Sequence, residues 1–116
     1  MEMTQLAPNL FAGAQISEAD LAMLASEGFT DVVCNRPDFE HPDSDPSSKL
    51  EDMSEKLGMA FHYLPITPGE PFVEEAEKLS SVVSRPNAKV FAYCRSGARV
   101  ANAWSLVSEA GTGNRR

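Results

Sequence analysis

One continuous stretch of the sequence combines an apolar strand, a cysteine at the strand's end, a tight loop and a helix. Residues 90–93 are apolar, and Cys94 follows them directly. The loop after the cysteine contains Gly97 and is closed by Arg99, and helix-forming residues continue to Trp104. A strand that turns directly into a helix favours an α/β fold, in which such loops lie at the edge of a sheet.

The residues from Cys94 to Arg99 also have the composition of an anion-binding site. Loop amides and the N-terminus of the following helix direct their N–H groups into one cup, where partial positive charge favours an anion. The same field stabilises a thiolate, since helix N-termini and arginines lower a cysteine pKa from its usual value of about 8.5. We therefore interpret Cys94 as a nucleophile. The alternative is a buried, inert cysteine before an ordinary turn.

Composition limits the classes of protein to which the chain can belong. Its 116 residues fit one domain, and the formal net charge of -7 argues against nucleic acid as a partner. No stretch is apolar enough for a membrane span and the start lacks the pattern of a signal peptide, so we expect a cytoplasmic protein. Two cysteines agree with a reducing compartment. An acidic body around a cationic loop favours a small anionic substrate.

Turn residues and apolar periodicity divide the chain into alternating strands and helices. We expect a hairpin over residues 6–13, strands at 30–34, 60–65 and 89–93, and helices at 17–28, 48–57, 72–83 and from the cysteine loop to about 110. Residues 35–47, rich in proline and acids, are expected to be a long loop. This alternation predicts an α/β fold with a mostly parallel central sheet and helices on both faces.

In such a sheet, ligands bind beyond the carboxyl ends of the strands. That edge is expected to bring together the cysteine loop, the turn at residues 35–38 and the loop at residues 66–71. We assign residues 1–110 to a single domain and residues 111–116 to a frayed C-terminal tail.

Four segments, in order along nearly the whole chain, resemble one bacterial family. They are Leu10–Gln15, Asp31–Asp38, Phe61–Ile66 and Tyr93–Arg99. The family is the beta-lactamase-hydrolase-like, phosphatase-like domain, whose fold is that of the cysteine-based protein tyrosine and dual-specificity phosphatases. The resemblance implies a phosphate-binding loop between the last strand and the last helix, within a single phosphatase-like domain.

The resemblance also implies roles for the loop residues. Cys94 would attack phosphorus or sulfur, and Arg99 would clamp the transferred group in bidentate fashion. The amides of the loop would hold the developing charge, which makes Arg95, Ser96, Gly97 and Ala98 anion-binding residues.

Three departures from the phosphatase pattern leave the chemistry open. Cys94 and Arg99 enclose four residues where tyrosine phosphatases have five, and four is the spacing of the rhodanese sulfurtransferase loop. Val100 stands where phosphatases have a serine or threonine, and Ser96 is the candidate substitute for that hydroxyl. The expected aspartate acid is missing from residues 66–71, so Glu70 is the candidate general acid, the alternative being a solvent-facing residue before a helix.

Two further residues each have two interpretations. Arg36 follows a strand end and is either a second clamp on the anion or a surface arginine paired with Asp38. Cys34 is either a resolving thiol for Cys94 or, as strand cysteines more often are, part of the core.

These observations favour a cysteine-dependent phosphatase-like hydrolase that uses Cys94, Arg99 and Glu70. A sulfurtransferase carrying a persulfide on Cys94 is the second hypothesis, and a non-catalytic anion-binding module is the third. We expect no cofactor and no metal site, and a small phosphoester or sulfur species as substrate. Whether the domain works fused to, or beside, a protein of sulfur metabolism is left open.

Overall fold

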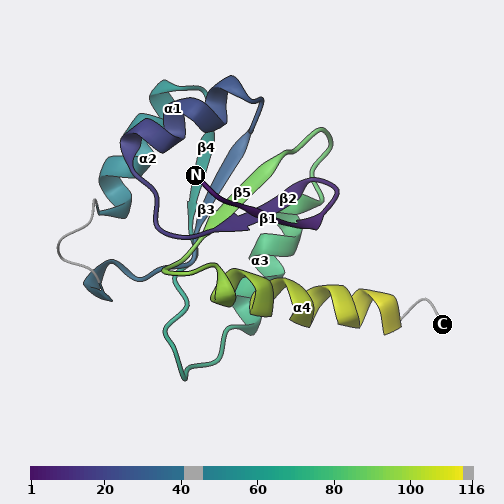
Figure 1. The fold of residues 1–116 in the computed structure, drawn as a ribbon. Coiled ribbons are helices and arrows are strands. Elements are labelled where there is room, and N and C mark those ends of the chain that lie inside the picture. The colour runs from purple at the N-terminus through teal and green to yellow at the C-terminus, as the bar shows by residue number, and fades with distance from the viewer. Residues whose placement is uncertain (41–45, 114–116) are drawn as a thin grey trace.

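The computed structural model describes residues 1–40 and 46–113 of the chain (Figure 1). Its sheet has five strands in the order β1-β2-β5-β3-β4. The strands are β1 (Thr4–Ala7), β2 (Leu10–Gly13), β3 (Asp31–Cys34), β4 (Ala60–Tyr63) and β5 (Val90–Tyr93). Only the pairing of β1 with β2 is antiparallel among these strands, and the other three pairings are parallel. The prediction of a mostly parallel sheet is confirmed.

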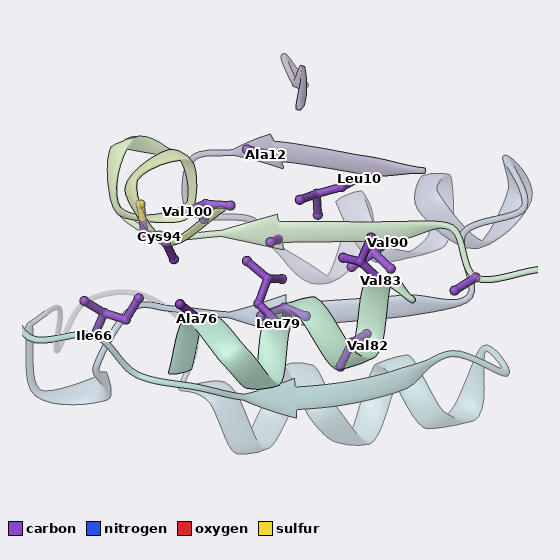
Figure 2. Packing of buried hydrophobic residues seen from close by; sticks show 14 residues of the cluster. Leu10, Ala12, Ile66, Ala76, Leu79, Val82, Val83, Val90, Cys94 and Val100 are labelled. Atoms are coloured by element: carbon purple, nitrogen blue, oxygen red, sulfur yellow. The ribbon is translucent and has the colours of Figure 1, made fainter. Parts of the chain in front are cut away.

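Four α-helices cover the sheet, two on each face (Figure 1). They are α1 (Glu18–Ser26), α2 (Ser47–Lys56), α3 (Val73–Val83) and α4 (Ala98–Gly113). Because side chains alternate along a strand, each buried strand supplies both cores. Val32 and Phe91 pack with α1 and α2, whereas Val33 and Ala92 pack with α3 and α4. Figure 2 shows the core on the α3 and α4 side, which includes Leu79 and Val100. Helices on both faces, as predicted, are confirmed.

The boundaries of the elements differ from the predicted ones by a few residues. Helix α1 begins at the predicted cap, where the Ser17 amide donates to the Asp20 carboxylate at 3.0 Å. The predicted loop at residues 35–47 contains a short 3-10 helix, η1 (Asp38–Glu40), and its residues 41–45 lie outside the described residues. Helix α4 ends at Gly113 and not near Ala110. Residues 114–116 are also outside the description, so the C-terminal tail stays a prediction.

The register of the sheet brings three loops to one edge. Beyond the carboxyl ends of the strands, the backbone pairing continues into the loops. Asn35 donates its amide to the Tyr93 carbonyl at 2.8 Å, and Ile66 donates to the Asn35 carbonyl at 2.9 Å. The Cys94 amide donates to the Gly13 carbonyl at 3.3 Å. These bonds hold the cysteine loop, the segment after β3 and the segment after β4 side by side, as predicted for this edge.

Within residues 1–40 and 46–113, no helix has the length and apolar character needed to cross a membrane. No group of three or more His, Cys, Asp or Glu side chains is arranged to hold a metal ion in this part of the chain.

Candidate active site

Cys94 lies between the end of β5 and the start of α4, at the end of the core that α3 and α4 cover (Figure 2). Its side chain is fully buried, and its Sγ accepts a hydrogen bond of 3.0 Å from the Gly97 amide. Gly97 has a φ of 94°, a conformation that glycine adopts without strain. This backbone conformation turns the Gly97 N–H toward the sulfur, where it stabilises negative charge.

The rest of the cysteine loop also offers N–H groups to an anion. Within the described parts of the chain, the amides of Arg95 and Ser96 have no hydrogen-bond acceptor. The Ala98 amide is 3.4 Å from Ser96 Oγ, and helix bonding begins when Ala101 donates to the Gly97 carbonyl at 3.1 Å. The structure therefore places all four predicted anion-binding residues of the loop at the N-terminus of α4, where free amides favour an anion.

Arg99 is held at the loop by three hydrogen bonds. Its Nη1 and Nη2 donate to the two carboxylate oxygens of Glu40 at 2.7 and 2.8 Å, and Nη1 also donates to the Ile66 carbonyl at 2.9 Å. A guanidinium has five N–H donors, so the Nε–H and one Nη2–H remain, on one adjacent edge. That edge has the fork geometry that binds two oxygens of a phosphoryl or similar group. The bond to Glu40 and, to a smaller extent, nearby Cys94 raise the pKa of Arg99.

Glu40 is a site residue that sequence reasoning missed. Its carboxylate is bonded to Arg99 and lies 3.4 Å from the Nε of Arg36. The hydrogen bond from Arg99 is the main cause that lowers the pKa of Glu40. Glu40 is therefore ionised near neutral pH and is not a proton donor there. The one signal in the sequence is its spacing of four residues from Arg36.

The short segment that carries Glu40 is fixed on both sides. The Asp38 amide donates to the Tyr63 hydroxyl at 3.0 Å. The Asp38 carboxylate accepts from the Ser47 amide at 2.8 Å and from the Ser47 hydroxyl at 2.7 Å, at the start of α2. Asp38 thereby satisfies an otherwise unpaired amide of that helix. The contacts of Asp38 to β4 and α2 thus hold the short segment that carries Glu40.

Arg36 lies beside the site but is directed at Glu40. Its side chain is only 4% exposed, and its Nη1 donates to Gln15 Oε1 at 3.0 Å. Its ion pair is with Glu40, whereas Asp38, its alternative partner in the sequence interpretation, binds Ser47. Arg36 therefore supports the carboxylate that orients Arg99, and direct contact between Arg36 and an anion stays a prediction.

Glu70 and Arg99 line the same hollow. This hollow, here called the Arg99 hollow, has a volume of about 260 Å³ and is formed by residues 66–70, Phe72, Arg99 and Asn102. Glu70 is exposed, and its amide donates to the Thr67 carbonyl at 3.0 Å in a turn through Gly69. The structure thus brings together the predicted clamp and the predicted general acid.

Cys34 and Cys94 lie on opposite faces of the sheet. Cys34 pairs in register with Tyr93, so Cys94, one residue further on, has its side chain on the other face. Cys34 packs in the core under α1 and α2, and its thiol donates to the Arg36 carbonyl at 3.2 Å. Burial raises the pKa of the Cys34 thiol. These contacts support the interpretation of Cys34 as a core residue.

The fold and the site together define a class of protein. A buried cysteine between a central parallel strand and a helix N-terminus, with an arginine at the same loop, is the arrangement of the cysteine-based phosphatases. The family described as "Beta-lactamase hydrolase-like protein, phosphatase-like domain" matches residues 2–112. The chain belongs to this family, as its sequence resemblance predicted.

Known proteins agree with this assignment. The beta-lactamase hydrolase-like protein of Agrobacterium fabrum is 24% identical over 108 residues. The match covers 91% of this chain and 25% of that protein, so the chain spans about a quarter of its relative's length. A solved structure of Neisseria meningitidis, the "putative phosphatase" nma1982, has a TM-score of 0.80 at 27% identity, covering 90% of this chain and 74% of that one.

Two more distant structures share the fold. Tk-PTP in its active form has a TM-score of 0.70 at 24% identity and covers 91% of this chain and 73% of its own. The core catalytic domain of the PP-IP phosphatase SIW14 from S. cerevisiae was solved in complex with citrate. It has a TM-score of 0.62 at 11% identity, and the match covers 82% of this chain and 56% of that chain. At these identities the two structures show the shared fold alone.

Proposed function

We propose that the chain is a cysteine-dependent phosphatase-like hydrolase. The Cys94 thiolate attacks the phosphorus of a phosphomonoester, an S–P bond forms, and the bond from phosphorus to the leaving oxygen breaks. Water then attacks the phosphocysteine, which releases phosphate and regenerates the thiolate. The observation that carries the proposal is the arrangement of the Gly97 amide and the Arg99 guanidinium around Cys94.

Charge stabilisation is the main contribution of this loop to the reaction. The transferred group spreads negative charge over its oxygens in the transition state. The unpaired amides of Arg95 and Ser96 and the remaining N–H groups of Arg99 are donors for those oxygens. Such donors, held in place before the reaction, stabilise developing charge more than they stabilise the substrate.

Glu70 is the candidate acid for the leaving group. In the first step it donates a proton to the leaving oxygen, and in the second step its carboxylate accepts a proton from the attacking water. Among the residues that line the Arg99 hollow, Glu70 is the one with a carboxyl group. Glu40, the other carboxylate at the site, is committed to Arg99.

The second step has to proceed without a hydroxyl directly after the arginine. Val100 occupies that position and is fully buried in the core. Ser96 is the hydroxyl within the loop, and its Oγ accepts from Ala98, which leaves its proton available. Ser96 is therefore the candidate group for stabilising the Cys94 thiolate as it leaves.

Sulfur transfer is the second candidate, and the length of the loop favours it. Helix α4 begins at Ala98, so three residues separate Cys94 from the helix. A short loop offers fewer amides around a narrower cup, which suits a terminal persulfide sulfur better than a phosphoryl group. A persulfide on Cys94 passes its sulfur to a nucleophilic acceptor and needs no general acid.

One set of assays separates these functions. Phosphate release from 4-nitrophenyl phosphate and thiocyanate formation from thiosulfate and cyanide are measured for the wild type, Cys94→Ser and Cys34→Ser. We expect phosphate release that Cys94→Ser abolishes and Cys34→Ser retains, because Cys34 lies on the other face of the sheet. Glu70→Gln should lower turnover of esters with poor leaving groups by about 100-fold or more. Thiocyanate formation without phosphate release would replace the proposal by sulfur transfer, and neither activity would leave an anion-binding module.

A further inference from the structure

A second and larger cavity lies along the cysteine loop, on the side of the first two strands. This β1 cavity has a volume of about 460 Å³. Ser96 and Gly97 of the cysteine loop form one wall, and Gly13 and Ala14 after β2 and residues 2–4 form others. The Arg99 hollow is lined by Arg99, Asn102 and the loop after β4, so the two cavities share no lining residue.

Most of the residues that line the β1 cavity are small or apolar. Alanines, glycines, Met3 and Leu6 supply most of the lining, and Thr4 and Ser96 add hydroxyl groups. Glu2 is the charged residue among them. A volume of this size accommodates an organic group such as an aromatic ring. A group that carries further negative charges would meet the Glu2 carboxylate and no cation in the lining.

The chemistry at the leaving oxygen determines which cavity the organic group enters. An ester oxygen is bent, so the incoming proton and the carbon substituent lie on different sides of it. Glu70 and Arg99 approach from the Arg99 hollow. Ser96 and Gly97 of the cysteine loop do not line that hollow and line the β1 cavity instead, so the β1 cavity is the space beside the loop for a carbon substituent that points away from Glu70.

We infer that the β1 cavity binds the organic part of the phosphomonoester, and that this part is neutral or amine-bearing and not anionic. The inference rests on the proposed function and specifies its substrate class. The Cys94 loop then holds the transferred group, the Arg99 hollow supplies the acid, and the β1 cavity selects the leaving alcohol by size and charge.

The test fills the cavity without touching the reacting groups. Ala14 is exposed and lines the cavity, so Ala14→Leu narrows the cavity with little risk to folding, and Ala101→Leu narrows it from α4. Ala22→Leu adds the same volume on an exposed position of α1 as the matched control. Phenyl phosphate and 2-naphthyl phosphate are the probes, because their leaving groups differ in size and little in acidity.

We expect both cavity variants to lower kcat/KM for 2-naphthyl phosphate relative to phenyl phosphate by about 10-fold or more, and the control to leave this ratio unchanged. Dissociation constants of the two esters, measured by calorimetry in the Cys94→Ser background, should show the same selective loss. The binding measurement needs no turnover, so it tests the assignment of the β1 cavity even if the proposed hydrolysis fails. Equal effects of the cavity variants on the two esters, or no effect on either, would overturn that assignment.

Charge selection is tested with two aryl phosphates of similar size. Tyramine phosphate carries an amine, and phosphorylated 3-(4-hydroxyphenyl)propionate carries a carboxylate. We expect the wild type to prefer the amine, and Glu2→Gln to reduce that preference by about two- to fivefold, the scale of an exposed charge pair. A preference for the carboxylate would overturn the assigned substrate class.

Discussion

Arg99 binds Glu40 through both terminal nitrogens, at 2.7 and 2.8 Å, although the two residues are 59 positions apart. The Ile66 carbonyl takes a further N–H of the guanidinium. These contacts fix the plane of the guanidinium and leave its Nε–H and one Nη2–H outside the bonds to Glu40 and Ile66. In the proposed mechanism, Glu40 is therefore a positioning residue that orients Arg99.

Replacing Glu40 by Gln should impair catalysis by releasing Arg99. The neutral amide cannot accept both bonds, and a guanidinium displaced by about 1 Å is expected to lower kcat/KM by about 10- to 100-fold. Because Glu40 is not the proton donor, the shape of the pH profile of kcat/KM should stay that of the wild type. Kinetics from pH 5 to 9, an interval of about two units around neutrality, make this comparison.

The exposed Glu55 of α2 provides the control for that experiment. Glu55→Gln removes the same charge far from any contact of Arg99 and should leave kcat/KM unchanged. A Glu40→Gln protein with wild-type kcat/KM would contradict the positioning role, and loss of a limb from its pH profile would make Glu40 an acid.

The ion pair between Arg99 and Glu40 should make the free energy of unfolding depend on pH. Arg99 lowers the pKa of Glu40 in the folded protein below its ordinary value of 4.5. The stabilisation is therefore present in full above pH 4.5 and is lost as the pH falls through the lower folded pKa. Urea unfolding at a series of pH values should show that the wild type has a larger free energy of unfolding than Glu40→Gln above pH 4.5. This difference should shrink as the pH falls through the lower pKa of Glu40 in the folded protein. A difference that does not vary with pH would contradict this linkage.

The cysteine loop and the order of elements were predictable from local sequence. The strand before Cys94 is continuously apolar, and Ser17, Asp20 and Gly28 mark both ends of α1. Both signals arise within a few residues of the element that they specify. For Glu40 the sequence held only its four-residue spacing from Arg36, because its contact with Arg99 depends on the parallel pairing of β3 with β5.

The relation between the two cysteines was not readable from the sequence for a similar reason. Cys34 and Cys94 each follow an apolar run at a strand end. Whether they share a face depends on the register of β3 against β5, in which Cys34 pairs with Tyr93. A shift by one residue would have placed both on one face, and no local pattern specifies that register.

The contacts of Asp31 predict an effect on the free energy of unfolding that is independent of the candidate active site. It is fully buried at the start of β3, where it accepts hydrogen bonds from the Thr30 hydroxyl at 2.6 Å and from Arg85, and lies 2.8 Å from His62 Nε2. Arg85→Met should destabilise the protein by about 1–3 kcal/mol, a value reduced because Arg85 is half exposed.

A double-mutant cycle with Asp31→Asn tests this account. Replacing the buried carboxylate first should make Arg85→Met less costly, since the group with which Arg85 pairs is then absent. Each variant that folds should keep wild-type kcat/KM, because Asp31 is at the amino end of β3 and Cys94 follows the carboxyl end of β5. Additive free energies of unfolding would show that the pair is not coupled.

Gly97 and Gly58 form a matched pair for testing the loop itself. Their φ angles are 94° and 85°, and a Cβ at Gly97 would make only an ordinary contact of 3.5 Å, while Gly58 faces open space. Alanine at either position should therefore cost a similar amount, about 1–2 kcal/mol, in urea unfolding. Gly97→Ala should also lower kcat/KM by about 10- to 100-fold, because relaxation toward negative φ turns its N–H away from the Cys94 sulfur. Gly58→Ala should keep full kcat/KM, and equal activities for the two variants would mean that the Gly97 amide does not act on the reacting sulfur.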